Sequence, residues 1–125
     1  MNETLKNSTG LTKDTGWQIS LRRTLPYPLI QVWELLVSAE GIRTWLGTGY
    51  QGVIKPLSHI RITRHPQDNA YPRSSTIQVR VLEKGEKSIL IFHEEYLPNQ
   101  QERVRRRSFY LEVMEKITEL LRKNR

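Results

Sequence analysis

The feature that most constrains the fold is a long C-terminal segment without a helix-breaking residue. From Gln100 to about Lys123 there is neither proline nor glycine. Its apolar residues recur every three or four positions, which predicts one buried stripe along an α-helix. A helix of about 24 residues is about 36 Å long and can lie across a whole sheet. Asn99, with Glu102 three residues later, has the spacing of a capping box at the helix start. The predicted stripe consists of Tyr110, Val113, Met114, Ile117, Leu120 and Leu121.

Much of the preceding chain alternates between apolar and polar residues, which is typical of half-buried β-strands. The first strand begins near Trp17 and ends before Pro26, because proline has no N–H to donate to a sheet. A hairpin turn is predicted at Lys84-Gly85-Glu86, and hairpins join antiparallel strands. The other strands are predicted at Tyr50–Ile54, Ser58–Arg64, Thr76–Glu83 and Ser88–Tyr96.

Two short helices are predicted directly after the first strand. Pro28 suits the first turn of one helix, which runs to about Val37, and Ser38 can cap the next. The order of strand, two short helices, antiparallel strands and one long helix predicts an α+β fold. A strongly twisted sheet cannot close tightly on a straight helix along its whole length. We therefore expect a cavity between sheet and helix, where a ligand would bind.

The length of 125 residues and the absence of cysteine fit one domain in a reducing compartment. Residues 1–15 are expected to be a flexible leader, and residues 16–125 the folded domain. The polar N-terminus lacks the apolar core of a signal peptide, and no stretch approaches the about 20 apolar residues of a membrane span. These features predict a cytoplasmic protein.

The formal net charge of +7 suggests an acidic ligand, an anionic membrane surface or a nucleic acid as partner. The densest basic cluster is Arg103 to Arg107, which we interpret as mainly a solvent-facing helix surface. A nucleic acid is the least favoured partner, because the chain has no basic strand with regularly placed aromatic residues.

Three short blocks in the first half of the chain carry a family resemblance. Val32-Trp33-Glu34-Leu35-Leu36, Ser38-Ala39-Glu40-Gly41-Ile42 and Trp45-Leu46-Gly47 resemble the homology domain of activators of heat-shock-protein-90 ATPase. That family belongs to the START-like, or SRPBCC, superfamily. The resemblance implies the helix-grip fold, a curved antiparallel sheet around a long C-terminal helix, and the binding of small apolar molecules. Relatives usually have two strands where this chain has only the ten residues Thr48–Leu57.

The candidate ligand site follows from the expected cavity between sheet and helix. Glu94 can enter it with the apolar residues of its strand, since neighbouring residues in a strand point to opposite faces. We expect Arg103 to bridge to Glu94 or Glu95, and alternatively to contact an anionic head group at the pocket mouth. No catalytic residue, metal ligand or cofactor is predicted. The predicted apolar lining consists of Ile60, Ile62, Ile77, Val79, Leu90, Phe92, Tyr110, Val113, Met114 and Ile117.

The leading functional hypothesis is a binder of a small apolar or amphipathic molecule that is non-enzymatic or only marginally enzymatic. A protein-interaction module of stress response, analogous to a co-chaperone, is the second hypothesis. A cyclase or hydrolase acting on a hydrophobic substrate is the third, with Glu94 as its only candidate polar group. The sequence leaves the oligomeric state open.

Overall fold

A computed structural model describes residues 11–12, 16–47, 50–51, 59–64 and 75–123. In this part of the chain the strands form a six-stranded sheet with the order β1-β2-β6-β5-β4-β3. Every pair of neighbours in that order is antiparallel, as the hairpin pattern predicts. The strands are β1 (Leu11–Thr12), β2 (Gly16–Leu25), β3 (Tyr50–Gln51), β4 (His59–Arg64), β5 (Ser75–Lys84) and β6 (Lys87–Leu97).

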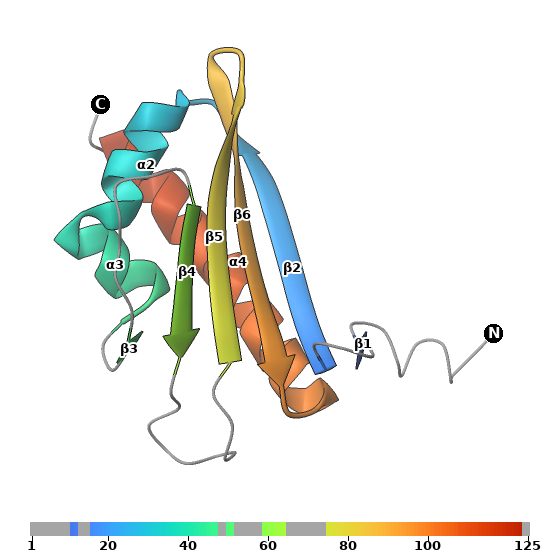
Figure 1. The fold of residues 1–125 in the computed structure, drawn as a ribbon. Coiled ribbons are helices and arrows are strands. Elements are labelled where there is room, and N and C mark those ends of the chain that lie inside the picture. Colours follow the sequence, from blue (N-terminus) through green and yellow to red (C-terminus); the bar gives the residue numbers. More distant parts are fainter. Residues whose placement is uncertain (1–10, 13–15, 48–49, 52–58, 65–74, 124–125) are drawn as a thin grey trace.

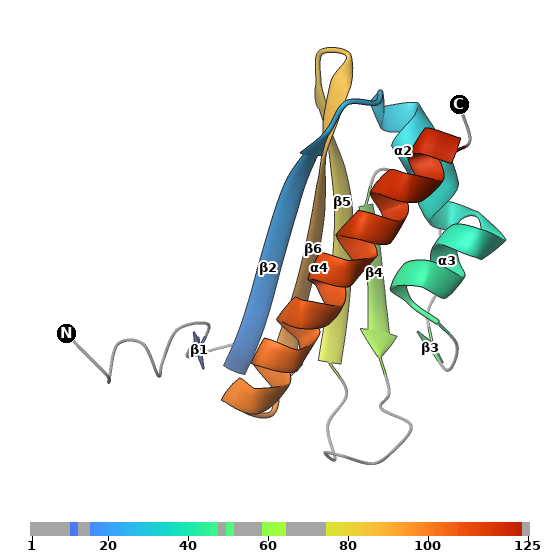
Figure 2. The ribbon, with the colours of Figure 1, turned by 180° about the vertical axis from the view of Figure 1, so that it is seen from behind.

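Three helices of the described residues lie on one side of this sheet. They are α2 (Leu29–Val37), α3 (Ala39–Trp45) and α4 (Gln100–Lys123). The long helix α4 crosses the sheet diagonally, from the start of β2 and the end of β6 towards α2 (Figure 2). Seen from the other side, the strands lie in front and all three helices lie behind or beside them (Figure 1). The predicted α+β architecture and its long C-terminal helix are confirmed.

The boundaries of the helices have local causes that the sequence indicates. The side chain of Ser38 accepts a hydrogen bond from the backbone N–H of Gly41 at 3.0 Å and so caps α3. The side chain of Asn99 accepts from the N–H of Glu102 at 2.8 Å at the start of α4. Both are the caps that the sequence predicts.

Gly41 has a second role, at the contact between α2 and α3. A Cβ atom at this position would lie 1.8 Å from the carbonyl oxygen of Leu35. Only glycine allows the two helices to approach this closely.

The core lies between the helices and the inner face of the sheet. Along β5 and β6 every second residue is buried, and the register places Val79 beside Phe92 and Val81 beside Leu90. The helix α4 contributes the ring of Tyr110 to this core. It also contributes four buried aliphatic or thioether side chains, those of Val113, Met114, Ile117 and Leu121. The packing of these side chains joins the two layers.

Two sequence predictions extend beyond the described residues. The strand predicted at Tyr50–Ile54 is described only at Tyr50–Gln51, and residues 52–58 lie outside the described residues. Most of the expected N-terminal leader also lies outside, but Leu11 and Thr12 pair with Trp17 and Gly16 of β2. The boundary between leader and domain stays a prediction.

Candidate functional site

A cluster of buried polar side chains lies where the first turns of α4 meet the sheet. Its centre is Glu94 of β6, whose side chain is fully buried. The carboxylate oxygen Oε1 accepts hydrogen bonds from Nε of Arg106 at 2.7 Å and from the hydroxyl of Tyr110 at 2.8 Å. The other oxygen, Oε2, accepts from the hydroxyl of Ser75. We call these four residues the Glu94 network.

The sequence periodicity explains why these side chains meet. Glu94 points to the inner face because it continues the alternation of Leu90 and Phe92 along β6. Arg106 and Tyr110 are four residues apart on α4, so both lie on the same side of the helix. Nη2 of Arg106 lies 3.2 Å from the Tyr110 hydroxyl oxygen, which connects the two helix residues directly.

Aromatic rings line the network. Phe92 stacks on Tyr110 with ring centroids 5.0 Å apart, and Phe109 meets Tyr110 edge to face at 5.3 Å. The guanidinium of Arg106 lies 4.3 Å from the ring centroid of Phe109, a cation–π contact. These rings keep water away from the ion pair, which strengthens the attraction between its charges.

The environment fixes the protonation of the two helix residues. Burial alone would lower the pKa of Arg106, but the nearby Tyr110 and Glu94 outweigh burial and raise that pKa above its ordinary value. Burial, followed by the negative charge of Glu94, raises the pKa of Tyr110 well above its ordinary value. At neutral pH, Arg106 is therefore a cation and Tyr110 an uncharged hydrogen-bond donor.

Arg106 also connects the network with the surface. Its side chain is 10% exposed, whereas that of Glu94 is 0% exposed. A guanidinium has five N–H donors, and the described bonds engage Nε and Nη2. Within the described part of the chain Nη1 has no hydrogen-bond partner, and the side chain as a whole is not completely buried.

The structure corrects the role expected for Arg103. The arginine at Glu94 is Arg106, one turn further along α4. Nε of Arg103 instead donates to the backbone carbonyl of Gln18 at 2.8 Å. The other expected acceptor, Glu95, has its Oε1 3.0 Å from Nε2 of His93. Sequence reasoning missed Arg106 and Ser75; the spacing of four between Arg106 and Tyr110 was the available signal for the first of them.

Eight of the ten apolar residues predicted to line the pocket are tightly packed in the core. The side chains of eight of them have at most 2% of their surface exposed, so protein atoms surround them. Large side chains from both layers pack against one another among these eight residues. Two further predicted residues, Ile60 and Ile62, are on β4, and their side chains lie outside the described residues. The eight packed residues are Ile77, Val79, Leu90, Phe92, Tyr110, Val113, Met114 and Ile117.

Two hollows open on the surface of the described residues. A groove of about 260 Å³ lies on the outer face of the sheet. A hollow of about 340 Å³ lies between α2, the start of α3 and the end of α4, and Glu34, Glu40 and Leu121 are among its lining residues. No cluster of three or more possible metal ligands occurs among the described residues.

Comparisons with solved structures identify the fold. CalU16 from Micromonospora echinospora superposes with a TM-score of 0.70 at 16% identity, over 84% of this chain and 74% of CalU16. Protein MLL2253 from Mesorhizobium loti gives 0.69 at 16% identity, over 86% of this chain and 98% of that protein. The AHSA1-like protein RHE_CH02687 from Rhizobium etli gives 0.58 at 18% identity, over 89% and 86%.

Sequence comparisons add no relative to these structures. No protein-family profile and no curated protein matches the chain. No helix of the described residues is both long enough and apolar enough to cross a membrane. The structural likeness confirms the resemblance predicted from the sequence at the level of fold: the chain has the START-like, helix-grip fold.

Proposed function

We propose that this protein binds a small amphipathic molecule between the sheet and α4, with the polar end of the molecule at Arg106. The observation that carries the proposal is the Glu94 network itself. A buried ion pair is often no more stabilising than apolar residues of similar volume would be. An Arg–Glu pair in this position is therefore poorly explained by stability alone, and recognition of a ligand is a use for it.

The free donor of Arg106 defines the chemistry of the polar end. Because the described bonds to Glu94 and Tyr110 use Nε and Nη2, Nη1 would donate to a carboxylate, phosphate or carbonyl oxygen of the ligand while those bonds stay in place. Beyond this point the interface is apolar, with Phe92, Tyr110 and Met114 all buried. A molecule with a hydrogen-bond acceptor at one end and an apolar body therefore matches the arrangement, with the acceptor at Arg106 and the apolar body along the helix–sheet interface.

The packed interface requires that binding be coupled to movement. An apolar body can enter only if side chains between the sheet and α4 separate, so the ligand selects a more open state. The measured dissociation constant is then the dissociation constant of the open state divided by the fraction of protein molecules in that state. The fold shared with CalU16 and the AHSA1-like protein supports a helix–sheet site, but the identity of the ligand is not inherited from them.

The test is native mass spectrometry of the purified protein, followed by thermal melting with dodecanoate and with dodecanol. These two probes share one chain length and differ in the acidic head. We expect dodecanoate to raise the melting temperature more than dodecanol at the same concentration. Above the dissociation constant, the stabilisation by either probe should grow with the logarithm of its concentration. The double variant Glu94→Gln/Arg106→Met should lose this preference, and the variant Arg107→Met at the exposed neighbouring position should keep it. A preference that survives the double variant, or the absence of any shift with either probe, would refute the proposal.

A further inference from the structure

The outer face of the sheet, opposite the three helices, is a second candidate site. In the described part of the chain no helix covers this face (Figures 1 and 2). The groove of about 260 Å³ lies here and crosses the three central strands β2, β6 and β5. Its lining consists of Ser20, Gln78, Arg80, Ile91 and His93.

The strand register arranges the side chains of the groove and of its edge, where Arg22 lies, into two rows. In one row Ser20 and Gln78 both pair with His93, so a hydroxyl, an imidazole and an amide lie side by side. In the next row Arg22 and Arg80 both pair with Ile91. Two arginines therefore flank one apolar residue, with backbones about 10 Å apart because neighbouring strands are separated by about 4.8 Å.

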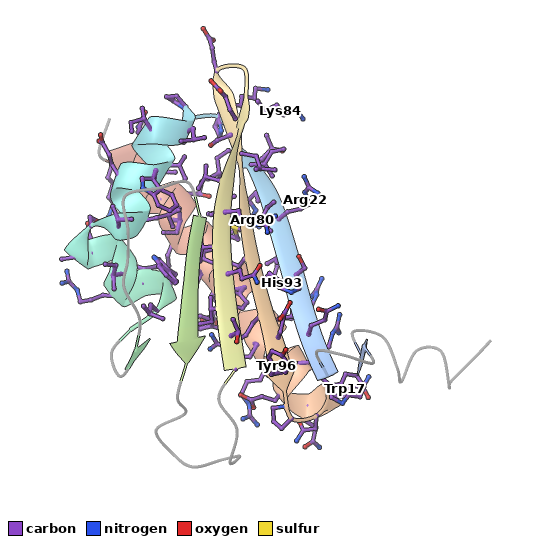
Figure 3. The ribbon with its side chains drawn as sticks, in the orientation of Figure 1. Trp17, Arg22, Arg80, Lys84, His93 and Tyr96 are labelled. Carbon is purple, nitrogen blue, oxygen red and sulfur yellow. The ribbon has the colours of Figure 1, made fainter. Side chains whose placement is uncertain are left out.

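The charges of this face are not balanced within the described residues. Arg22 and Arg80 are exposed, and neither makes an ion pair there. By contrast, Arg23 on the inner face of β2 pairs with Glu115 at 3.0 Å. The acidic residue beside the groove, Glu95, is engaged by His93. Figure 3 shows Arg22, Arg80 and His93 gathered on one face, with Lys84 at the hairpin end.

We propose that this groove docks an extended acidic segment of a partner protein. Two carboxylates of the segment would meet Arg22 and Arg80, and an apolar side chain between them would lie on Ile91. In an extended chain, residues at positions one, three and five point to the same side, and the outer two are about 13 Å apart. That spacing fits two splayed arginine side chains whose backbones lie about 10 Å apart. The sequence Glu-Ser-Val-Ser-Glu has this arrangement.

The composition of the groove favours a polypeptide over a single-stranded nucleic acid. Nucleic-acid bases bind open sheets by stacking on aromatic rings. None of the groove residues has such a ring except the imidazole of His93, which is tied to Glu95. The polar row next to the arginines supplies a hydroxyl and an amide, which can bond the backbone of an extended peptide.

The test measures binding of a fluorescein-labelled Glu-Ser-Val-Ser-Glu peptide by fluorescence anisotropy. The probes for comparison are the same peptide with glutamine in place of glutamate, and a labelled oligothymidylate. The decisive variant is the double charge reversal Arg22→Glu/Arg80→Glu. The matched control is Arg43→Glu/Arg107→Glu, which changes the net charge equally at exposed positions of α3 and α4.

We expect the acidic peptide to bind and the glutamine peptide to bind much more weakly. The groove variant should weaken binding of the acidic peptide about tenfold or more, and the control should change it less than about twofold. Raising the salt from about 50 mM to about 300 mM should weaken binding, because these charges are exposed. Three results would overturn the proposal: no binding of the acidic peptide at low salt, an equal loss in both variants, or tighter binding of oligothymidylate through the same arginines. Circular dichroism checks that both variants are folded.

Discussion

Replacing Glu94 by glutamine tests how the Glu94 network is held together. Glutamine has nearly the same volume, so the change removes a charge and leaves no cavity. The carboxylate accepts from Arg106 at 2.7 Å, from Tyr110 at 2.8 Å and from Ser75. Without it, the cation of Arg106 stays nine-tenths buried with its opposite charge gone. Removing one partner of a buried pair costs about 3–5 kcal/mol.

The lower part of that range is expected here, because the glutamine carbonyl can still accept a bond from Arg106 or Tyr110. We expect a loss of about 3–4 kcal/mol in the free energy of unfolding. For a domain of this size, that is a fall of about 12–16 °C in melting temperature. Urea denaturation followed by circular dichroism measures the free energy of unfolding, and a thermal melt measures the melting temperature.

The double variant Glu94→Gln/Arg106→Met supplies the critical comparison. It removes both charges, and methionine fills much of the volume of the arginine stem. The unfolding free energy should return to within about 1.5 kcal/mol of the wild-type value, because no uncompensated charge remains buried. The reasoning fails if the double variant is less stable than Glu94→Gln alone, or if Glu94→Gln costs less than about 1 kcal/mol.

Three further predictions concern the surrounding core. The pKa of Tyr110 is raised in the folded state, so its contribution to stability is complete below the unfolded-state pKa of about 10 and is lost as pH rises towards the folded value. Unfolding measured above pH 10 should depend less steeply on pH in Tyr110→Phe than in wild type; equal slopes would contradict this. The variant Gly41→Ala should cost at least about 3 kcal/mol in urea denaturation, because its Cβ would lie 1.8 Å from the carbonyl oxygen of Leu35; a cost below about 1 kcal/mol would be incompatible with that contact. The indole N–H of Trp45 donates to a backbone carbonyl at 2.9 Å, whereas that of Trp33 is buried and has no hydrogen-bond partner among the described residues. Trp45→Phe should therefore cost about 1–2 kcal/mol more than Trp33→Phe, and equal costs would refute this comparison.

The sequence by itself predicted the kinds and order of the elements from β2 onwards, whereas β1 lies within the expected leader and was not predicted. Residues close in sequence were sufficient for these predictions, because the end of a helix or strand is set by the caps, prolines and glycines beside it. Pro26 ends β2, Ser38 and Asn99 cap helices, and Gly85 at φ 62° turns the hairpin between β5 and β6. Alternation along β6 also placed Glu94 on the inner face.

Only the tertiary structure decided which side chains meet across the two layers. Arg103 and Arg106 both lie on or near the buried stripe of α4, and periodicity cannot choose between them. The choice depends on how far α4 is displaced along β6, which is set by packing over the whole interface and places Arg106 at Glu94. The same packing surrounds the eight described lining residues with protein atoms, because large side chains from both layers meet there. Arg22 and Arg80 flank Ile91 on the outer face only because β2, which is distant in sequence from the β5–β6 hairpin, pairs with β6 in this register.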